Sequence, residues 1–109
     1  MILNDEQKMV QDMLRNYSQN KLKELGELGA LGMTVSEQWG GAGLDYVSLV
    51  AALEEIAAGD GAISTIVSVQ NSLPCGITQR YGTEEQKQKY LTKLATGEWL
   101  GCFCLTEPQ

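Results

Sequence analysis

The chain has 109 residues, enough to close one hydrophobic core and too few for a second one. With 43% hydrophobic and 20% charged residues, it falls outside the disordered and fibrous classes, and we expect one globular domain over residues 1–109. The net charge of −6 argues against nucleic-acid binding, which depends on clustered Lys and Arg side chains.

The amino-terminal residues show neither a targeting segment nor a membrane anchor. Residues 1–6 lack a basic region before an apolar one, and no run in the sequence approaches the ~18 apolar residues of a membrane span. We therefore expect no membrane span and a cytoplasmic location. A mitochondrial matrix protein whose presequence has been removed would show the same pattern.

Two apolar stripes follow in the first third of the chain. Asn4 as N-cap and Gln7 three residues later form a capping box that starts a helix. The first stripe consists of Met9, Val10, Met13, Leu14 and Tyr17, and the second of Leu22, Leu25, Leu28 and Leu31. Because the two periods do not join across residues 18–21, the sequence predicts either two helices or one long bent helix.

Glycines punctuate the next stretch of the chain. Gly29 and Gly32 are expected to end the helical section, and residues 33–39 to cross the surface in extended form. The glycine-rich residues 40–43 carry neither a Gly-Lys-Ser/Thr ending nor Gly-x-Gly-x-x-Gly spacing. We therefore interpret them as a turn into the next helix rather than a phosphate-binding loop.

Two further helices are predicted, over residues 45–58 and 62–81. Glu54 and Glu55 point about 100° apart on the first helix, so they are not a paired acid and base. The second helix is apolar nearly all round, as a central helix is, and its small polar residues can hydrogen-bond inside the domain. Pro74 predicts that this helix kinks or begins again there, and leaves open whether a pocket forms.

The carboxyl-terminal quarter predicts a short helix and a strand. Thr83 and Gln86 form a second capping box, and Gly97 stops the helix. The basic residues on that helix are Lys87, Lys89 and Lys93. They alternate with acidic and amide residues, which indicates a solvated face. Residues 98–105 then resemble a lone strand that needs a partner from outside this chain.

The three cysteines do not form a disulfide framework, because their number is odd and their spacing uneven. Cys102 and Cys104 share a face of the predicted strand but lack the further Cys or His ligands of a tetrahedral metal site. We interpret Cys75, Cys102 and Cys104 as packed thiols and predict no metal site. Redox or metal chemistry is the alternative reading.

Six motifs occur in series: LGALGM at 28–33, WGGAGLD at 39–45, LEEIA at 53–57, NSL at 71–73, YGTEEQK at 81–87 and FCLTEP at 103–108. Together they resemble the amino-terminal helical domain of acyl-CoA dehydrogenases, and the NSL and Gly-Cys-Phe segments are most similar to the short-chain, butyryl-type branch. The resemblance implies an all-α helical bundle with a short extended segment at its end.

The resemblance also implies an FAD enzyme that converts acyl-CoA thioesters to trans-2-enoyl-CoA. A carboxylate base takes the α proton, the β hydrogen leaves as hydride to the flavin, and electron-transferring flavoprotein reoxidises the flavin. The cofactor supplies the redox chemistry and the protein the positioning. By this resemblance we expect FAD, acyl-CoA and electron-transferring flavoprotein as partners, and a homo-oligomer.

Two groups of site residues follow from the resemblance, carried over by position. The segment beside the isoalloxazine ring, with Thr106 as its best contact to the flavin, consists of Phe103, Cys104, Leu105 and Thr106. The helix that borders the fatty acyl chain contributes Val69, Leu73 and Ile77, with Gln70 as a plausible neighbour.

The chain departs from the family pattern in three ways. It lacks the middle β-barrel and the carboxyl-terminal helical domain that carries the catalytic glutamate, so no catalytic residue is assigned and Glu107 is not taken as the base. About twenty residues are missing between Gln19 and Leu22. Cys104 stands where a small apolar residue is commoner.

The leading hypothesis is therefore the amino-terminal part of an acyl-CoA dehydrogenase, which contributes one wall of an acyl and flavin site and is inactive alone. The alternative is a stand-alone helical interaction module that kept the fold and lost the chemistry. A third possibility is an artefact of the gene model, in which case the function belongs to the uncut parent protein.

Overall fold

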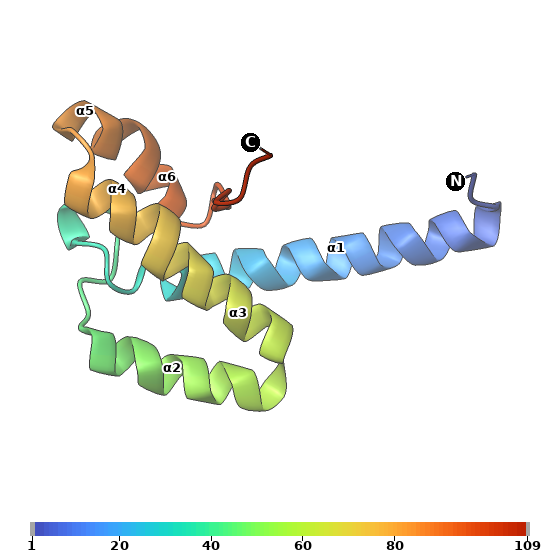
Figure 1. Cartoon of the computed structure of the whole chain (residues 1–109). Coiled ribbons are helices and arrows are strands. Elements are labelled where there is room, and N and C mark those ends of the chain that lie inside the picture. Colours follow the sequence, from blue (N-terminus) through green and yellow to red (C-terminus); the bar gives the residue numbers. More distant parts are fainter. Residues whose placement is uncertain (1, 109) are drawn as a thin grey trace.

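A computed structural model describes residues 2–108, and within them the chain is helical without strands, which confirms the predicted all-α class. The long helix α1 extends away from a body that is built from shorter helices (Figure 1). The elements are α1 (Asp5–Glu27), η1 (Ala30–Gly32), η2 (Glu37–Trp39), α2 (Tyr46–Gly59), α3 (Gly61–Gln70), η3 (Asn71–Cys75), α4 (Gly76–Tyr81), α5 (Glu84–Gln86), η4 (Lys87–Leu91) and α6 (Thr92–Ala95).

The first helix is continuous, which decides between the two alternatives left open by the sequence. The predicted capping box forms, since the Asn4 side chain accepts from the Gln7 backbone and the Gln7 side chain accepts from the Asn4 backbone. Only the carboxyl end of α1 packs on the body. There a Cβ atom on Gly26 would lie 2.6 Å from the Thr96 carbonyl oxygen, so glycine permits the close approach.

Residues 33–39 do not form the extended surface segment that was predicted, although residues 36–38 are exposed. Met33 and Val35 are buried, and the following residues form η2. The loop folds back on itself because the Gly43 amide donates to the Val35 carbonyl at 2.8 Å and the Leu44 amide to the Met33 carbonyl at 2.7 Å. These bonds satisfy the backbone, so the apolar side chains can enter the core.

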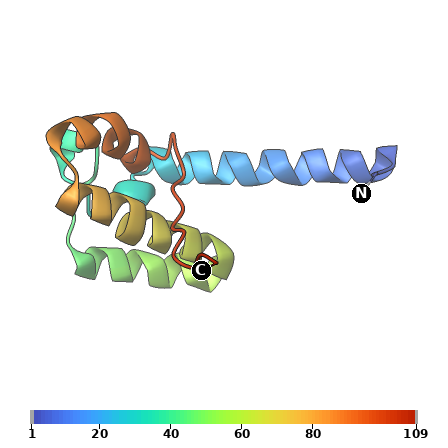
Figure 2. The same cartoon turned by 45° about the horizontal axis from the view of Figure 1, so that its top comes forward.

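Helices α2 and α3 form an antiparallel hairpin (Figure 2). Asp45 caps α2 by accepting from the Ser48 amide, and Asp60 caps α3 by accepting from the Ala62 and Ile63 amides. These hydrogen bonds fix the point at which each helix begins. The predicted 45–58 helix is therefore confirmed to within one residue at each end, with Asp45 as its cap.

Pro74 neither ends nor restarts the central helix, because the chain passes it through the wider π turn η3. The Gly76 amide donates to the Asn71 carbonyl five residues earlier, so the turn widens around the proline, which has no N–H to donate. As predicted, polar side chains of this helix bond inside the domain. Buried Asn71 accepts from the Met33 amide at 2.7 Å and donates to the Ala30 and Val67 carbonyls.

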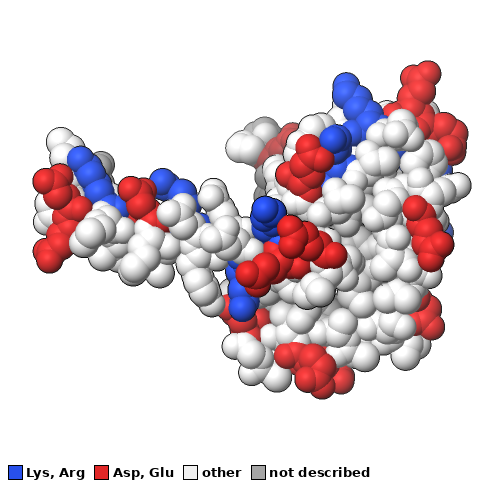
Figure 3. Space-filling model, turned by 180° about the vertical axis from the view of Figure 1, so that it is seen from behind, with Lys and Arg blue, Asp and Glu red and all other residues white. Residues whose placement is uncertain are grey.

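The core lies where η3, η4 and α6 meet the loop. Its buried residues are Val35, Cys75, Leu91 and Ala95, flanked by Trp39 and Leu94. The predicted Thr83 capping box and the stop at Gly97, which has φ of 75°, both form. Acidic side chains lie at several places over the face of the body seen in Figure 3, some of them beside Lys or Arg side chains.

Candidate functional site

The predicted acyl-wall residues form one stripe on the continuous rod α3, η3 and α4. Val69 and Leu73 are half-buried, and Ile77, two turns after Val69, is 40% exposed. Their spacing of four residues places them on one face of the rod. The structure therefore brings these three predicted residues together, as an apolar strip that is partly open.

Ile77 also borders an open hollow at the end of this strip. The hollow has a volume of roughly 320 Å³, and Tyr81 and Tyr90 lie along it. Its lining combines the apolar side chain of Ile77 and the two tyrosine rings with the polar side chains of Thr78 and Gln86, and it contains no Asp, Glu, Lys or His.

Gln70 stands beside this strip, but its side chain is buried and bonded to the protein backbone. Its amide nitrogen donates to the Leu94 carbonyl at 2.8 Å and the Trp99 carbonyl at 3.0 Å. Its amide oxygen accepts from the Gly101 N–H at 2.9 Å. Gln70 therefore anchors the start of the terminal segment to the central helix, a role that the sequence comparison did not assign to it.

The terminal segment crosses the central helix at a close contact. A Cβ atom on Gly101 would overlap the ring of Pro74, so glycine is required where the two backbones approach. The stretch from Trp99 to Gly101 is thus held by Gln70 on one side and Pro74 on the other. The signal in the sequence that could have revealed this anchor is Gln70, a polar residue on an apolar helix one turn before Pro74.

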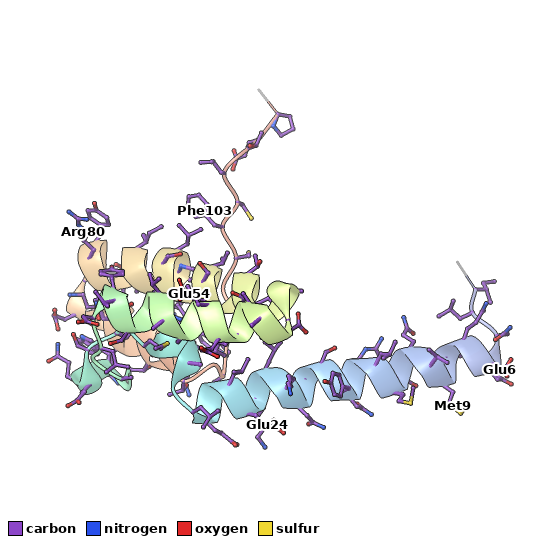
Figure 4. The ribbon with its side chains drawn as sticks, turned by 90° about the horizontal axis from the view of Figure 1, so that it is seen from below. Glu6, Met9, Glu24, Glu54, Arg80 and Phe103 are labelled. Carbon is purple, nitrogen blue, oxygen red and sulfur yellow. The ribbon has the colours of Figure 1, made fainter. Side chains whose placement is uncertain are left out.

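After Gly101 the chain leaves the helices, and Figure 4 shows Phe103 where the segment turns outward. Phe103 is 49% exposed and Leu105 is 77% exposed. Within residues 2–108, no backbone hydrogen bond joins residues 102–108 to another part of the chain. The predicted strand therefore does not form, since nothing in the described chain pairs with it. The predicted flavin segment, Phe103 to Thr106, is extended and open.

The cysteines fall into two environments. Cys75 is fully buried, and its S–H lies 3.8 Å from the Leu31 carbonyl oxygen; burial raises the pKa of Cys75 to about 12. Cys102 and Cys104 are exposed with sulfur atoms 3.9 Å apart, so the interpretation as packed thiols was wrong for this pair. The hydrogen bond with Cys102 raises the pKa of Cys104, which disfavours its thiolate.

The described residues contain no group of three His, Cys, Asp or Glu side chains placed to hold a metal ion. The same part of the chain has no helix long and apolar enough to cross a membrane. The site that the residues do build is an apolar strip bordered by an open extended segment. That arrangement can line a pocket for an apolar chain and a planar ring.

Comparison with known families decides what this arrangement belongs to. The model of the family described as acyl-CoA dehydrogenase, N-terminal domain, matches residues 17–98. The chain belongs to the acyl-CoA dehydrogenase family. The matched range includes the entire acyl strip and Gln70.

Curated acyl-CoA dehydrogenases give the same result. The short-chain specific, mitochondrial acyl-CoA dehydrogenase of Rattus norvegicus is 44% identical over 84% of this chain and 22% of its own length. The Homo sapiens protein of that name is 46% identical over 81% of this chain and 21% of its own length. The short-chain specific acyl-CoA dehydrogenase of Clostridium acetobutylicum is 36% identical over 97% of this chain and 33% of its own length. This acyl-CoA dehydrogenase domain thus spans about a fifth to a third of these relatives.

The lengths of the matches indicate an internal gap in this chain. The Clostridium match runs over 124 positions and that to a Bacillus subtilis acyl-CoA dehydrogenase over 126, more than the 109 residues of the chain. About 18 positions of these relatives therefore have no counterpart here. The rat match, which covers 84% of this chain over 92 positions, has no such excess.

Proposed function

We propose that the chain forms the amino-terminal part of a flavin-dependent acyl-CoA dehydrogenase, with residues 1–109 as its truncated helical domain. The activity is the α,β-dehydrogenation of acyl-CoA thioesters to trans-2-enoyl-CoA. The observation that carries the proposal is the open Phe103 to Thr106 segment, anchored by Gln70 beside the Val69 and Leu73 strip. When bound, FAD supplies the two-electron acceptor.

The residues present fit this role in their chemistry. A flavin ring has two flat apolar faces and a polar edge, and the terminal segment offers a half-exposed aromatic side chain, unpaired backbone groups and the Thr106 hydroxyl. We assign the flavin wall to Phe103, Cys104, Leu105 and Thr106. We assign the acyl wall to Val69, Leu73 and Ile77, with Gln70 as a neighbour that holds the two walls together.

The proposal extends to partners and location. The catalytic base and most of the cofactor cradle lie outside these residues, so the domain is inactive alone. Electron-transferring flavoprotein reoxidises the flavin, and the complete enzyme is a homo-oligomer. It works in the cytoplasm, or in the mitochondrial matrix if its source is a eukaryote; the rat and human relatives are mitochondrial acyl-CoA dehydrogenases, which supports a mitochondrial location in that case.

A chimera tests the proposal. Residues 22–108 of this chain replace the matching region of the Clostridium relative, and the purified chimera is assayed for bound flavin and for reduction of that flavin by butyryl-CoA. We expect the chimera to retain FAD and to bleach on addition of butyryl-CoA. The isolated 109-residue chain, given the same FAD and butyryl-CoA, should not bleach at a useful rate.

Two variants of the chimera locate the acyl wall. Leu73→Asp places an unpaired carboxylate in the apolar strip, at a cost of at least about 2 kcal/mol, or roughly thirtyfold in kcat/KM. Ser72→Asp adds the same charge at an exposed neighbouring position and should change kcat/KM by less than about threefold. Equal kcat/KM values for the two variants would remove Leu73 from the acyl wall, and a folded chimera without FAD would refute the flavin wall.

One observation favours the second candidate, an interaction module without catalysis. The apolar stripe of α1 is exposed and lies outside the acyl and flavin face. A discrete oligomer that lacks flavin affinity in every combination with partner domains would support the module.

A further inference from the structure

The terminal segment carries two neighbouring thiols whose sulfur chemistry the proposed function does not use. Only Phe103 separates Cys102 from Cys104 in the chain, and their sulfur atoms lie 3.9 Å apart. The third cysteine, Cys75, is buried in the core, and its sulfur faces the Leu31 carbonyl oxygen instead. Of the three cysteines, the first two named are therefore the ones placed to react with each other.

A disulfide suits this pair better than a metal ion does. Protein metal sites need three or four ligands, and among the described residues no further Cys, His, Asp or Glu joins the two sulfur atoms to make such a group. A disulfide needs only the two sulfur atoms, which must approach each other by about 2 Å to reach bonding distance. Both partners lie in the described chain, so their pairing does not depend on which further residues cover the segment.

The backbone is constrained on one side of the pair and not on the other. The Gly101 amide donates to the Gln70 side chain at 2.9 Å, and Gly101 lies against the ring of Pro74. Beyond it, no backbone hydrogen bond joins residues 102–108 to another part of the described chain. An extended chain sets side chains two residues apart at about 6.6 Å, wider than a disulfide allows, so closure bends the chain at Phe103. No hydrogen bond of the described backbone opposes that bend.

We propose that Cys102 and Cys104 form a reversible dithiol site, which closes into an intrachain disulfide on reaction with a small-molecule disulfide such as oxidised glutathione. One cysteine sulfur attacks a sulfur of the small disulfide, whose S–S bond breaks and releases one glutathione, which takes up a proton. The second cysteine sulfur then attacks the first, forms the protein S–S bond and releases the other glutathione. The protein pair loses two electrons and two protons, which reduce one small disulfide to two thiols.

The interaction between the two thiols sets the order of attack. The hydrogen bond with Cys102, and then the charge of Cys102, raise the pKa of Cys104, so Cys104 stays protonated and Cys102 attacks first. Once Cys102 is held in the mixed disulfide it carries no charge, so Cys104 ionises more readily and completes the exchange. The bend at Phe103 opposes closure, which keeps the bond reducible by an excess of reduced glutathione.

Closure also redirects the flavin wall, a consequence that rests on the proposed function. Because Gly101 is held in place, the bend at Phe103 moves the chain beyond it, including Leu105 and Thr106. The extended form of the segment is the one that can lie along a flat ring. The bent form turns the aromatic side chain and the Thr106 hydroxyl away from that line, so oxidation weakens flavin binding.

Counting free thiols in the full 109-residue chain tests the closure. The chain is equilibrated at rising ratios of oxidised to reduced glutathione, quenched with acid, unfolded, alkylated and weighed. Labels should fall from three per chain to one without added glutathione mass, and should return to three in excess reduced glutathione. Cys75→Ala should fall from two labels to none, because Cys75 takes no part. Cys104→Ser should instead retain one glutathione on Cys102.

The closure is wrong if the wild-type chain keeps three labels at every ratio, or forms disulfide-linked dimers on a non-reducing gel. Loss of closure in Cys75→Ala would also overturn it, since Cys75 would then be one of the partners.

The chimera described above separates the redox effect from the proposed function. Its FAD affinity, measured by flavin fluorescence, should be several-fold weaker in oxidised than in reduced glutathione. Cys102→Ser in the chimera should remove this difference between the two buffers. Equal affinities for the unsubstituted chimera would overturn the effect on flavin. A chimera that binds no FAD in either buffer would refute the flavin wall instead, and the label count would still decide the closure.

Discussion

Gln70 shows at the scale of a single residue how one side chain can join the central helix to the terminal segment. Position on the helix suggested that Gln70 neighbours the acyl chain, whereas the structure directs its amide at three backbone groups of the carboxyl-terminal quarter. An amide side chain suits this role because it offers donors and an acceptor from one planar group. The start of the flavin segment is therefore fixed by the same helix that lines the acyl strip.

Replacement of Gln70 by Leu should release the terminal segment. The Leu94 and Trp99 carbonyls and the Gly101 amide would lose their partner, so we expect a loss of about 2–3 kcal/mol in the free energy of unfolding. Urea denaturation measures this loss, and limited proteolysis should show earlier cleavage near residue 101. Ser72→Ala, an exposed neighbour on the same helix, should change stability by less than about 0.5 kcal/mol. Equal values for the two variants would show that Gln70 is not an anchor.

At the scale of elements, short loops and glycines bring the helices together more than side-chain volume does. Gly32 in η1 lies against the backbone of Ala95 in α6, where a Cβ atom would meet the Ala95 Cα at 2.8 Å. Neither element can shift freely, because η1 is also tied to the central helix through Asn71. The sequence indicated a helix cap at Gly32, but the structure uses the absence of its side chain for packing.

Gly32→Ala should therefore separate η1 from α6. Because the obstructing atoms belong to the Ala95 backbone, we expect a loss of roughly 2 kcal/mol or more and a lower Tm. Gly59→Ala is the matched control, since its Cβ atom would meet nothing within 4 Å at the end of α2. That substitution should stabilise the fold by up to about 1 kcal/mol. Thermal unfolding of both variants distinguishes close packing from a general effect of alanine.

At the scale of the whole molecule, one small core holds several elements that are distant in sequence. Cys75 lies in that core between residues of the loop and of the last helices, and its thiol must remain protonated to stay there. Beyond this core the molecule has two open regions, the terminal segment and the α1 stripe. We propose that the first of them, the terminal segment, faces a flavin.

Because of the buried Cys75 thiol, we expect the free energy of unfolding to fall as the pH becomes alkaline. Its pKa rises from 9.0 to about 12 on folding, so the unfolded chain loses this proton first. Its contribution is full below pH 9 and declines as pH rises from 9 toward 12. Under reducing conditions, the wild type should lose more free energy of unfolding across this range than Cys75→Ala, by roughly a few kcal/mol. Parallel pH profiles for the two proteins would contradict this expectation.

The sequence by itself determined the features that depend on neighbouring residues. The capping boxes at Asn4 and Thr83 and the stop at Gly97 form as expected, because each needs contacts only a few residues along the chain. The alignment of Val69, Leu73 and Ile77 was predictable as well, since helical periodicity alone aligns residues four apart. The assignment of residues 103–106 to a flavin came from family motifs and stays a prediction.

Tertiary structure decided everything that depends on distant partners. Burial of Met33 and Val35 follows from Asn71, which bonds the loop from 38 residues away, and the use of Gln70 follows from backbone that arrives 24 to 31 residues later. Local residue propensities do not predict such contacts, because the same residues are equally compatible with an exposed loop or a free helix face. The continuity of α1 was left open by local periodicity, and the structure shows one unbroken helix over Asp5–Glu27.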